Sequence, residues 1–127
     1  MSASAVGFDL FARLEIPVIL EFGERTVVPA GFAIEIPIGY EAQIRPRSGL
    51  AAKKGITMLN SPGTIDPDYR GEVKVILANF GEVPVTIKNT DRIAQMVICP
   101  VVVPELIEVD ELSESDRGQN GFGSTGV

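Results

Sequence analysis

The sequence predicts an all-β protein with one short helix, built as a single domain. Short apolar runs recur along the 127-residue chain, and Gly, Pro, Asn or Asp separates each run from the next. In one run Phe32, Ile34 and Ile36 alternate with other residues, which is the period of a half-buried strand. Many short strands with regular turns are typical of a sandwich, a jelly roll or a barrel, and not of a helical or doubly wound fold.

The predicted strands follow one another along most of the chain. The first of them contains a turn at Pro29–Gly31, between the apolar pair Val27 and Val28 and the alternating run. A further strand end is expected at Ile65, before a turn rich in Asp and Pro. The expected strand ranges are Thr26–Pro37, Tyr40–Arg45, Gly55–Asn60, Glu72–Phe80, Pro84–Lys88, Arg92–Val103 and Leu106–Val109.

One short helix is predicted after Arg47. Ser48 is a good N-cap residue, Leu50–Lys54 consists of strong helix formers, and Gly55 fits the C-terminal stop. The free backbone N–H groups of a helix start, a hydroxyl and an adjacent arginine are able to hold an anion such as phosphate. On this segment alone, a capped connector with a surface arginine is the preferred interpretation.

The composition excludes several classes of function. The chain has no histidine, which excludes His-dependent triads and His metal ligands. Its only cysteine, Cys99, lies in an apolar run and is expected to pack as a small hydrophobic side chain. One cysteine also excludes an intrachain disulfide and a multi-Cys zinc site.

The charge and hydropathy indicate a cytoplasmic protein without a nucleic-acid or membrane partner. A formal net charge of −6 argues against broad binding to nucleic acid, although a small anion could bind at a locally positive pocket. We expect neither secretion nor membrane spanning, because no basic segment leads into a sustained apolar stretch and no run reaches ~18 apolar residues. A domain of this size has a modest core, and oligomerisation would bury more surface.

The segment Gly63–Gly71 reads GTIDPDYRG and carries the leading catalytic candidates. Pro67 fixes the backbone between Asp66 and Asp68, so a rigid turn presents two carboxylates and the phenol of Tyr69 from a strand end. Without histidine, acid–base chemistry falls first to these carboxylates. The alternative interpretation is that these residues only form a turn between two strands.

Residues 113–127 form an expected C-terminal arm after a β domain of residues 1–112. The arm is polar and rich in glycine, and it is too poor in apolar residues to fold alone, so a flexible tail is the simplest interpretation. Its glycines could nevertheless close over phosphate, while Arg117 pairs with charge and Phe122 stacks on a planar base. The segment is not a Walker motif, since the required lysine is absent.

Five ordered motifs together give a more specific signal, because the chain resembles the homotrimeric deoxyuridine triphosphatase (dUTP pyrophosphatase, dUTPase) family over nearly its whole length. One departure is that only Met1–Ala5 precedes the first motif, where family members commonly have an extra strand. The matching segments are Val6–Ala12 (VGFDLFA), Pro46–Ala51 (PRSGLA), Gly63–Glu72 (GTIDPDYRGE), Arg92–Val97 (RIAQMV) and Arg117–Gly126 (RGQNGFGSTG).

The resemblance implies a jelly-roll-like, distorted β-barrel subunit of the β-clip type, assembled as a homotrimer with active sites shared between subunits. It implies hydrolysis of dUTP to dUMP and pyrophosphate with Mg²⁺, in which Asp66 deprotonates the water that attacks the α-phosphorus. Asp68 is the competing acid, with turn capping as its expected role. Asp9 is expected to act on the metal through water, without being a direct ligand.

The resemblance also implies the substrate contacts. Tyr69 would pack under the deoxyribose and leave no space for a 2′-hydroxyl, the hairpin from Asn60 would read the uracil edge, and Phe122 would cover the base. The structural alternatives are that Tyr69 is a sheet residue, that Asn60 forms a turn and that Phe122 is an aromatic side chain of the tail without a binding role. The residues expected on the phosphates are Arg47, Ser48, Gly49 and Gln95, joined on closure by Arg117, Gly121, Gly123, Ser124 and Thr125 of the arm.

Three other functions remain as alternatives. A dCTP deaminase-like enzyme shares the implied fold but is expected to have a different turn after the aspartate. A nucleotide-binding protein without turnover is disfavoured by intact Asp66, Arg117 and Phe122. A structural jelly-roll protein would leave the five motifs unexplained.

Overall fold

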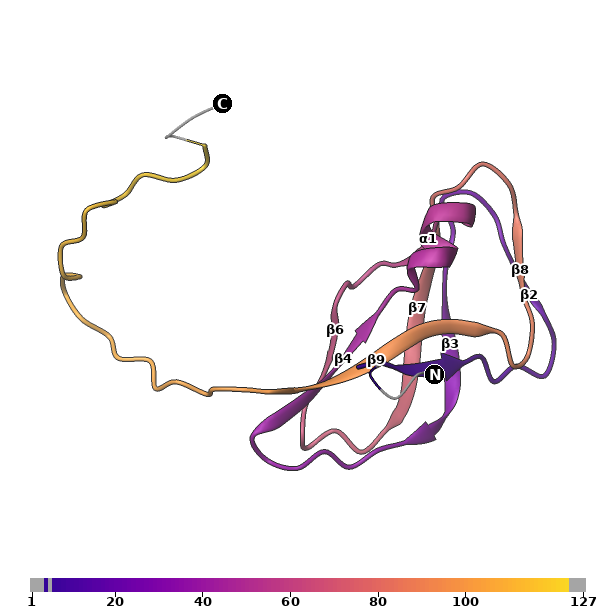
Figure 1. The fold of residues 1–127 in the computed structure, drawn as a ribbon, viewed down its shortest axis with the longest axis horizontal. Helices are drawn as coiled ribbons and strands as arrows, with labels where there is room; N and C mark the ends of the chain where they lie inside the picture. The colour runs from indigo at the N-terminus through magenta and orange to yellow at the C-terminus, as the bar shows by residue number, and fades with distance from the viewer. Residues whose placement is uncertain (1–3, 5, 124–127) are drawn as a thin grey trace.

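The computed structural model of the protein describes Ser4 and residues 6–123. These residues form nine β-strands and one helix (Figure 1), which confirms the predicted all-β class. The strands are β1 (Phe8–Phe11), β2 (Val18–Leu20), β3 (Arg25–Ala33), β4 (Tyr40–Arg45), β5 (Ile56–Met58), β6 (Gly63–Ile65), β7 (Glu72–Asn79), β8 (Val85–Ile87) and β9 (Arg92–Pro100), and the helix is α1 (Ser48–Lys54).

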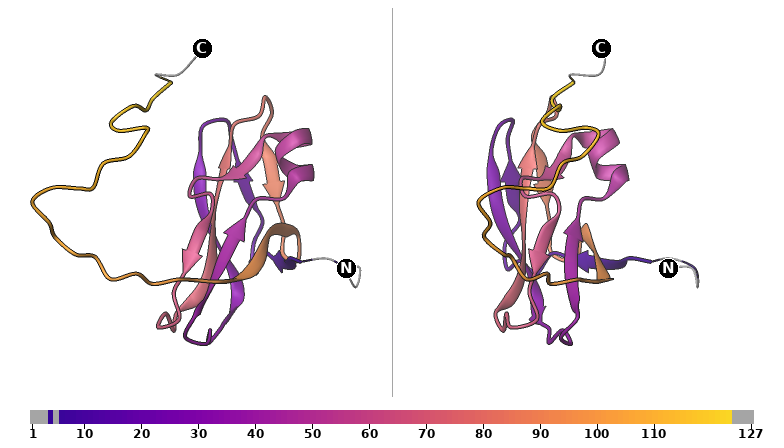
Figure 2. Two further views of the ribbon diagram at one scale, coloured as in Figure 1. Left: turned by 60° about the vertical axis from the view of Figure 1, so that its left-hand side comes forward. Right: turned by 90° about the vertical axis from the view of Figure 1, so that its left-hand side faces the viewer.

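The strands pair into three antiparallel sheets. Their orders are β1-β9-β4-β6, β3-β7-β5 and β2-β8, so each sheet is open and the described residues close no barrel. Figure 2 shows the strands layered against one another, with α1 at one end of the layers. The connection from β6 to β7 therefore passes from the edge of one sheet to the centre of another.

One apolar core joins the three sheets. Leu10 and Ile44 enter it from the four-stranded sheet, Leu20 from the two-stranded sheet, and Val28 and Val75 from the three-stranded sheet, all with 2% or less of their surface exposed. Burying each large apolar side chain contributes about 1.5–3 kcal/mol. No helix among the described residues is long and apolar enough to cross a membrane.

The first predicted strand was placed partly wrongly. Pro29–Gly31 is not a turn between two runs, because β3 continues through these residues to Ala33 with a shift in its register against β7. Gly31 takes a left-handed φ of 83° there, and its N–H donates to the Glu72 carboxylate at 3.1 Å. The strand ends before Ile36, whose side chain is nevertheless buried.

The strand predicted at Leu106–Val109 is wrong for this chain, and the predicted strand from Arg92 ends at Pro100 instead of Val103. A strand needs a neighbour for its backbone hydrogen bonds, whereas residues 101–123 form no helix or strand and run away from the sheets (Figures 1 and 2). Leu106 and Ile107 are 92% and 73% exposed. The apolar residues of this segment predicted a strand, but the described residues provide no neighbouring strand for it to pair with.

The helix is placed as predicted, but its start differs. Arg47 occupies the N-cap position without a side-chain cap hydrogen bond, so the prediction of Ser48 as N-cap is wrong and Ser48 is the first helical residue. The C-terminal stop is confirmed, because Gly55 has a left-handed φ of 68° and its N–H donates to the Ala51 carbonyl at 3.1 Å.

Candidate active site

The β6–β7 turn presents the predicted catalytic carboxylate at a strand end. Ile65, the last residue of β6, is buried, and Val73 at the start of β7 is 1% exposed, so both ends of the turn are held by the core. The Tyr69 N–H donates to the Asp66 carbonyl at 3.2 Å and closes a reverse turn. The Asp66 side chain follows directly after the buried strand and is exposed to solvent.

Asp66 and Tyr69 line the same pocket. Its volume is about 200 Å³, and its lining residues are Thr64, Ile65, Asp66, Tyr69, Glu72, Val73 and Lys74. Sites for drug-sized ligands usually enclose about 300–1,000 Å³. The pocket therefore accepts part of a nucleotide-sized molecule, with a carboxylate and a phenol in reach of it.

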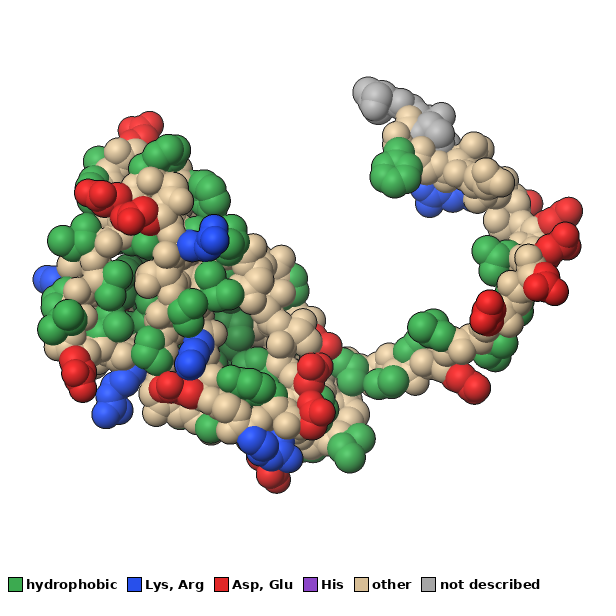
Figure 3. All heavy atoms as spheres, turned by 180° about the vertical axis from the view of Figure 1, so that it is seen from behind, with side chains coloured by type: hydrophobic (Ala, Val, Ile, Leu, Met, Phe, Trp, Pro, Cys, Tyr) green, Lys and Arg blue, Asp and Glu red, His purple; other side chains and the backbone are tan. Residues whose placement is uncertain are grey.

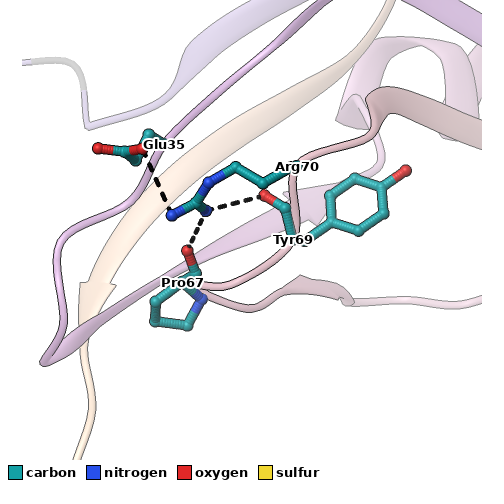
Figure 4. A network of polar contacts seen from close by, with 4 residues as sticks. All are labelled: Glu35, Pro67, Tyr69 and Arg70. Carbon is teal, nitrogen blue, oxygen red and sulfur yellow. Dashed lines mark hydrogen bonds and ion pairs between the residues drawn. The ribbon is translucent and has the colours of Figure 1, made fainter.

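Hydrogen bonds fix the aromatic ring and the backbone of this turn. The Tyr69 hydroxyl donates to the Glu72 carbonyl at 2.8 Å. Arg70 donates to the Pro67 carbonyl at 2.6 Å and to the Tyr69 carbonyl at 3.3 Å, and its guanidinium lies 3.4 Å from the Glu35 carboxylate. Figure 4 shows the guanidinium of Arg70 and the ring of Tyr69 on opposite sides of the turn. Exposed ion pairs contribute only about 0–1 kcal/mol, so the backbone contacts of Arg70 matter more for the turn.

The connection from β5 to β6 lies next to this turn in the sequence. The hairpin expected from Asn60 is wrong, because β5 pairs with β7 and β6 pairs with β4 in another sheet. Within the connection, the Ser61 hydroxyl donates to the Met58 carbonyl at 2.7 Å, and the Asn60 side chain is exposed. The Asn60 amide nitrogen lies 3.1 Å from the position that a Cβ on Gly63 would take, so the amide packs against the first residue of β6.

A second polar cluster surrounds the start of α1. Arg47 donates to the Arg92 carbonyl at 3.4 Å, and the Gln95 amide donates to the Pro46 carbonyl at 3.3 Å. Asp9 pairs with Arg92 at 3.5 Å across the β1–β9 ladder, with both side chains partly exposed. Sequence reasoning gave Arg92 no role, although its position at the start of the fourth motif marks it.

The two clusters lie in different hollows of the chain. Arg47 and Arg92 line a hollow of about 210 Å³, which shares no lining residue with the pocket of Asp66 and Tyr69. Its lining residues are Arg47, Leu50, Lys54, Val85, Thr86, Ile87, Asp91, Arg92 and Ile93. The predicted base and the predicted phosphate ligand Arg47 thus line different pockets of a single chain, and Ser48, Gly49 and Gln95 line neither of the two.

The arm supplies neither hollow with a lining residue among the described part of the chain. Figure 3 shows it arching away from the body with acidic and hydrophobic side chains along it. Arg117 donates to the Asn120 carbonyl at 2.6 Å, and the Phe122 side chain is fully exposed. Gly121 and Gly123 flank that ring, while Ser124 and Thr125 lie outside the described residues.

A metal cage is not present in the described residues, which contain no group of three or more His, Cys, Asp or Glu side chains able to hold an ion. Asp9 is 34% exposed and already paired with a guanidinium. The role of Asp9 toward a metal through water stays a prediction.

Comparisons with known proteins agree on one family. The dUTPase family model matches residues 1–126. A deoxyuridine 5'-triphosphate nucleotidohydrolase of Caldanaerobacter subterraneus subsp. tengcongensis is 58% identical over 127 residues, which covers 100% of this chain and 86% of the relative. The enzyme of the same name from Bdellovibrio bacteriovorus is 56% identical over 125 residues, which covers 98% of this chain and 84% of the relative.

Solved structures give the same result for the fold. A mutant dUTPase of Staphylococcus bacteriophage 80alpha with dUpNHpp aligns with a TM-score of 0.89 at 30% identity, covering 100% of this chain and 89% of the phage chain. A mutant dUTPase from phage phi11 of S. aureus, described with a structural Mg(II) ion, aligns with a TM-score of 0.77 at 27% identity over 88% of each chain. These matches confirm the jelly-roll-like fold that the resemblance implied.

Proposed function

This chain belongs to the dUTPase family, and from that premise we propose that it is a dUTP diphosphatase in which the Asp66 carboxylate activates the attacking water. The overall reaction converts dUTP and water to dUMP and pyrophosphate. The dCTP deaminase and the non-catalytic binding protein are not favoured, because the relatives at 56–59% identity are dUTP nucleotidohydrolases.

The placement of Asp66 carries this proposal. The carboxylate lies at the end of a core-anchored strand, in a pocket that it shares with the phenol of Tyr69, and it is accessible to water. As the water oxygen bonds to the α-phosphorus, Asp66 accepts a proton from the water, and the bond from the α-phosphorus to the bridging oxygen breaks. Pyrophosphate then leaves with the electron pair of that bond.

The sugar and base are assigned to the same end of the site. The ring of Tyr69 is held by its hydroxyl at the pocket wall, which supports the proposed steric exclusion of a 2′-hydroxyl. The β5–β6 connection with Asn60 enters β6 directly before this pocket and supplies backbone groups for the uracil edge. Phe122, which is free of packing in this chain, covers the base from above.

The phosphates are assigned to the cluster at the start of α1 and to the arm. Arg47 provides a fixed positive charge, Ser48 and Gly49 provide backbone donors, and Gln95 provides an amide beside Pro46. Arg117 and the glycines around Phe122 close over the terminal phosphate. Ser124 and Thr125 are assigned to the same phosphate.

The residues present fit a Mg²⁺ ion that binds mainly to the substrate phosphates and contacts the protein through Asp9. Magnesium usually keeps several waters and binds through one or two carboxylates together with substrate phosphates. Asp9 offers one partly exposed carboxylate beside the phosphate cluster, paired with the Arg92 guanidinium at 3.5 Å. When bound, the ion would neutralise charge on the phosphate oxygens, and Asp9 would hold it through water.

We further propose a homotrimer whose active sites are shared between subunits. Three features support this: Asp66 and Arg47 line separate small hollows, residues 101–123 extend away from the sheets, and the apolar side chains of Val102, Val103, Leu106, Ile107, Val109 and Leu112 are exposed. The roughly 14 residue steps from Val103 to Arg117 reach roughly 46 Å when extended, which is enough to leave the subunit. In this assembly residues 1–112 form the body and residues 113–127 close the site of a neighbour. Light scattering of the purified protein, with three subunits expected, tests the assembly.

The function is tested by turnover of dUTP, dTTP, dCTP and UTP with magnesium present. We expect strong preference for dUTP and release of pyrophosphate. Ammonia release from dCTP would identify a deaminase, and binding without turnover would identify a non-catalytic protein. Comparable hydrolysis of UTP would remove the role of Tyr69. A cytoplasmic location stays a prediction, to be checked by cell fractionation.

A further inference from the structure

Gly71 makes an unusually close approach to the ring of Tyr69. A Cβ on Gly71 would overlap the Tyr69 hydroxyl oxygen and would lie only 2.6 Å from Cζ and 3.0 Å from Cε1 of the ring. Distances below van der Waals contact cannot be kept, so any side chain at this position requires something to move. The ring of Tyr69 therefore occupies space that exists only because residue 71 is glycine.

We propose that Gly71 is a specificity-determining residue, because its bare α-carbon lets the Tyr69 ring lie in the one pose that discriminates dUTP from UTP. The inference rests on the function proposed above, in which Tyr69 excludes the 2′-hydroxyl. Gly71 does not touch the substrate in this proposal. It acts through Tyr69 and is a positioning residue.

The backbone at Gly71 is not what requires glycine. Gly71 is absent from the glycines with a left-handed φ among the described residues, so alanine is compatible with its backbone conformation. The chain after it is fixed, since Glu72 begins β7 opposite Ala33 and Val73 is buried in the core. The group that gives way is the tyrosine ring, which is 43% exposed and is held through its hydroxyl by the hydrogen bond to the Glu72 carbonyl.

Alanine at position 71 is thus expected to move the ring and leave the strand in place. The ring shift separates the Tyr69 hydroxyl from the Glu72 carbonyl, which it now meets at 2.8 Å. Tyr69 lines the pocket together with Asp66. The shift therefore changes the part of the pocket wall that contacts the sugar, while the Asp66 carboxylate stays at the end of β6. UTP should gain access, and dUTP should lose part of its sugar contact.

The test is the ratio of kcat/KM for dUTP to kcat/KM for UTP in Gly71→Ala, Tyr69→Leu and the double variant. We expect Gly71→Ala to lower this ratio by about tenfold or more, as for the loss of one steric contact in a pocket. Tyr69→Leu should lower it at least as far. In the Tyr69→Leu background, Gly71→Ala should have no further effect, since its route to the substrate is gone.

Leu20→Val serves as the control for a general loss of stability. Leu20 is buried in β2 and lines neither hollow of the proposed site, so this variant should lower Tm and leave the substrate ratio unchanged. An unchanged ratio in Gly71→Ala would overturn the inference, as would effects of the two single substitutions that simply multiply. These outcomes differ from failure of the proposed function, which the native protein reports first by hydrolysing dUTP no better than UTP.

Discussion

The β6–β7 turn and the C-terminal arm carry complementary parts of the proposed site, and they are held in opposite ways. The turn is anchored at both ends by buried residues and braced by hydrogen bonds to Pro67, Tyr69 and Glu72 carbonyls. The arm is exposed at every residue from 113 to 120, and its hydrogen bonds there are local. The fold therefore preorganises the proposed base and the proposed sugar pocket, whereas in the proposed function the phosphate cover is ordered by a neighbouring subunit or by substrate.

This difference has a thermodynamic side. Ordering a residue costs about 1–2 kcal/mol of backbone entropy, and the polar end of the arm buries little surface to offset that cost. For the turn, burial of the apolar residues at its two ends during folding offsets the same entropy cost. Substitutions in the turn should consequently change chemistry without changing closure, and substitutions in the arm should change closure without changing the fold.

The largest expected effect is that of Asp66→Asn. The amide is nearly isosteric and can hydrogen-bond to water, but it does not accept the proton, so kcat should fall by about 10²–10⁴-fold. dUTP binding and the trimer should remain, as measured by calorimetry and light scattering. Asp68→Asn is the matched control on the other side of Pro67 and should keep most activity. Near-normal kcat in Asp66→Asn would assign the base to Asp68 or Asp9.

Truncation after Leu112 should have the next largest effect. Loss of the phosphate cover is expected to lower kcat/KM for dUTP by about 10²-fold, comparable with the misplacement of a reacting group. Circular dichroism and Tm should stay close to native, because residues 113–120 are exposed and none of residues 113–123 belongs to the core. A truncated chain that fails to fold would show that the arm is structural.

Asn79→Ala in the body should do the reverse of the truncation: it should lower stability and leave activity nearly unchanged. This residue is fully buried, and its amide donates to the Leu20 and Val83 carbonyls while its oxygen accepts from the Gly81 N–H at 2.8 Å. Removing the side chain deletes three hydrogen bonds to backbone groups, one of them fully buried, and the free energy of unfolding should fall by about 2–3 kcal/mol. Urea denaturation measures this loss, and an unchanged midpoint would contradict it. Below the melting temperature, kcat should stay within a few fold.

Phe122→Ala should have the smallest effect. Stacking of an aromatic side chain on a base is worth about 1–3 kcal/mol, so KM for dUTP should rise by about five- to tenfold or more with little change in Tm. Phe80→Ala provides the control, since Phe80 is an exposed aromatic outside both hollows of the site. Equal changes in KM for the two variants would remove the stacking role of Phe122.

Local patterns predicted the parts of the fold and site that lie close in sequence. The turn at Asp66 and Tyr69 and the stop of α1 at Gly55 follow from neighbouring residues, and the structure confirms both. The strands β1 and β2 were not predicted. They are only four and three residues long, and they exist through pairing with β9 and β8, which are distant in the sequence.

Contacts over long sequence separations also limited the prediction of the site. The ion pair of Asp9 with Arg92 requires the β1–β9 register, which no single segment specifies. The same holds for the separation of Arg47 and Asp66 into two hollows, because it depends on how the sheets are layered. Residues on one turn were thus predictable, and their placement relative to a distant cluster was not.

The most direct test of the shared site is subunit complementation. Asp66→Asn protein and protein truncated after Leu112 are each expected to be nearly inactive, and they are refolded together in equal amounts. If one subunit supplies Asp66 and another supplies the arm, roughly a quarter of the sites in random trimers hold both intact parts, and dUTP hydrolysis should return to roughly a quarter of the native rate. Mixed trimers that are confirmed by native mass spectrometry and remain inactive would contradict the shared site.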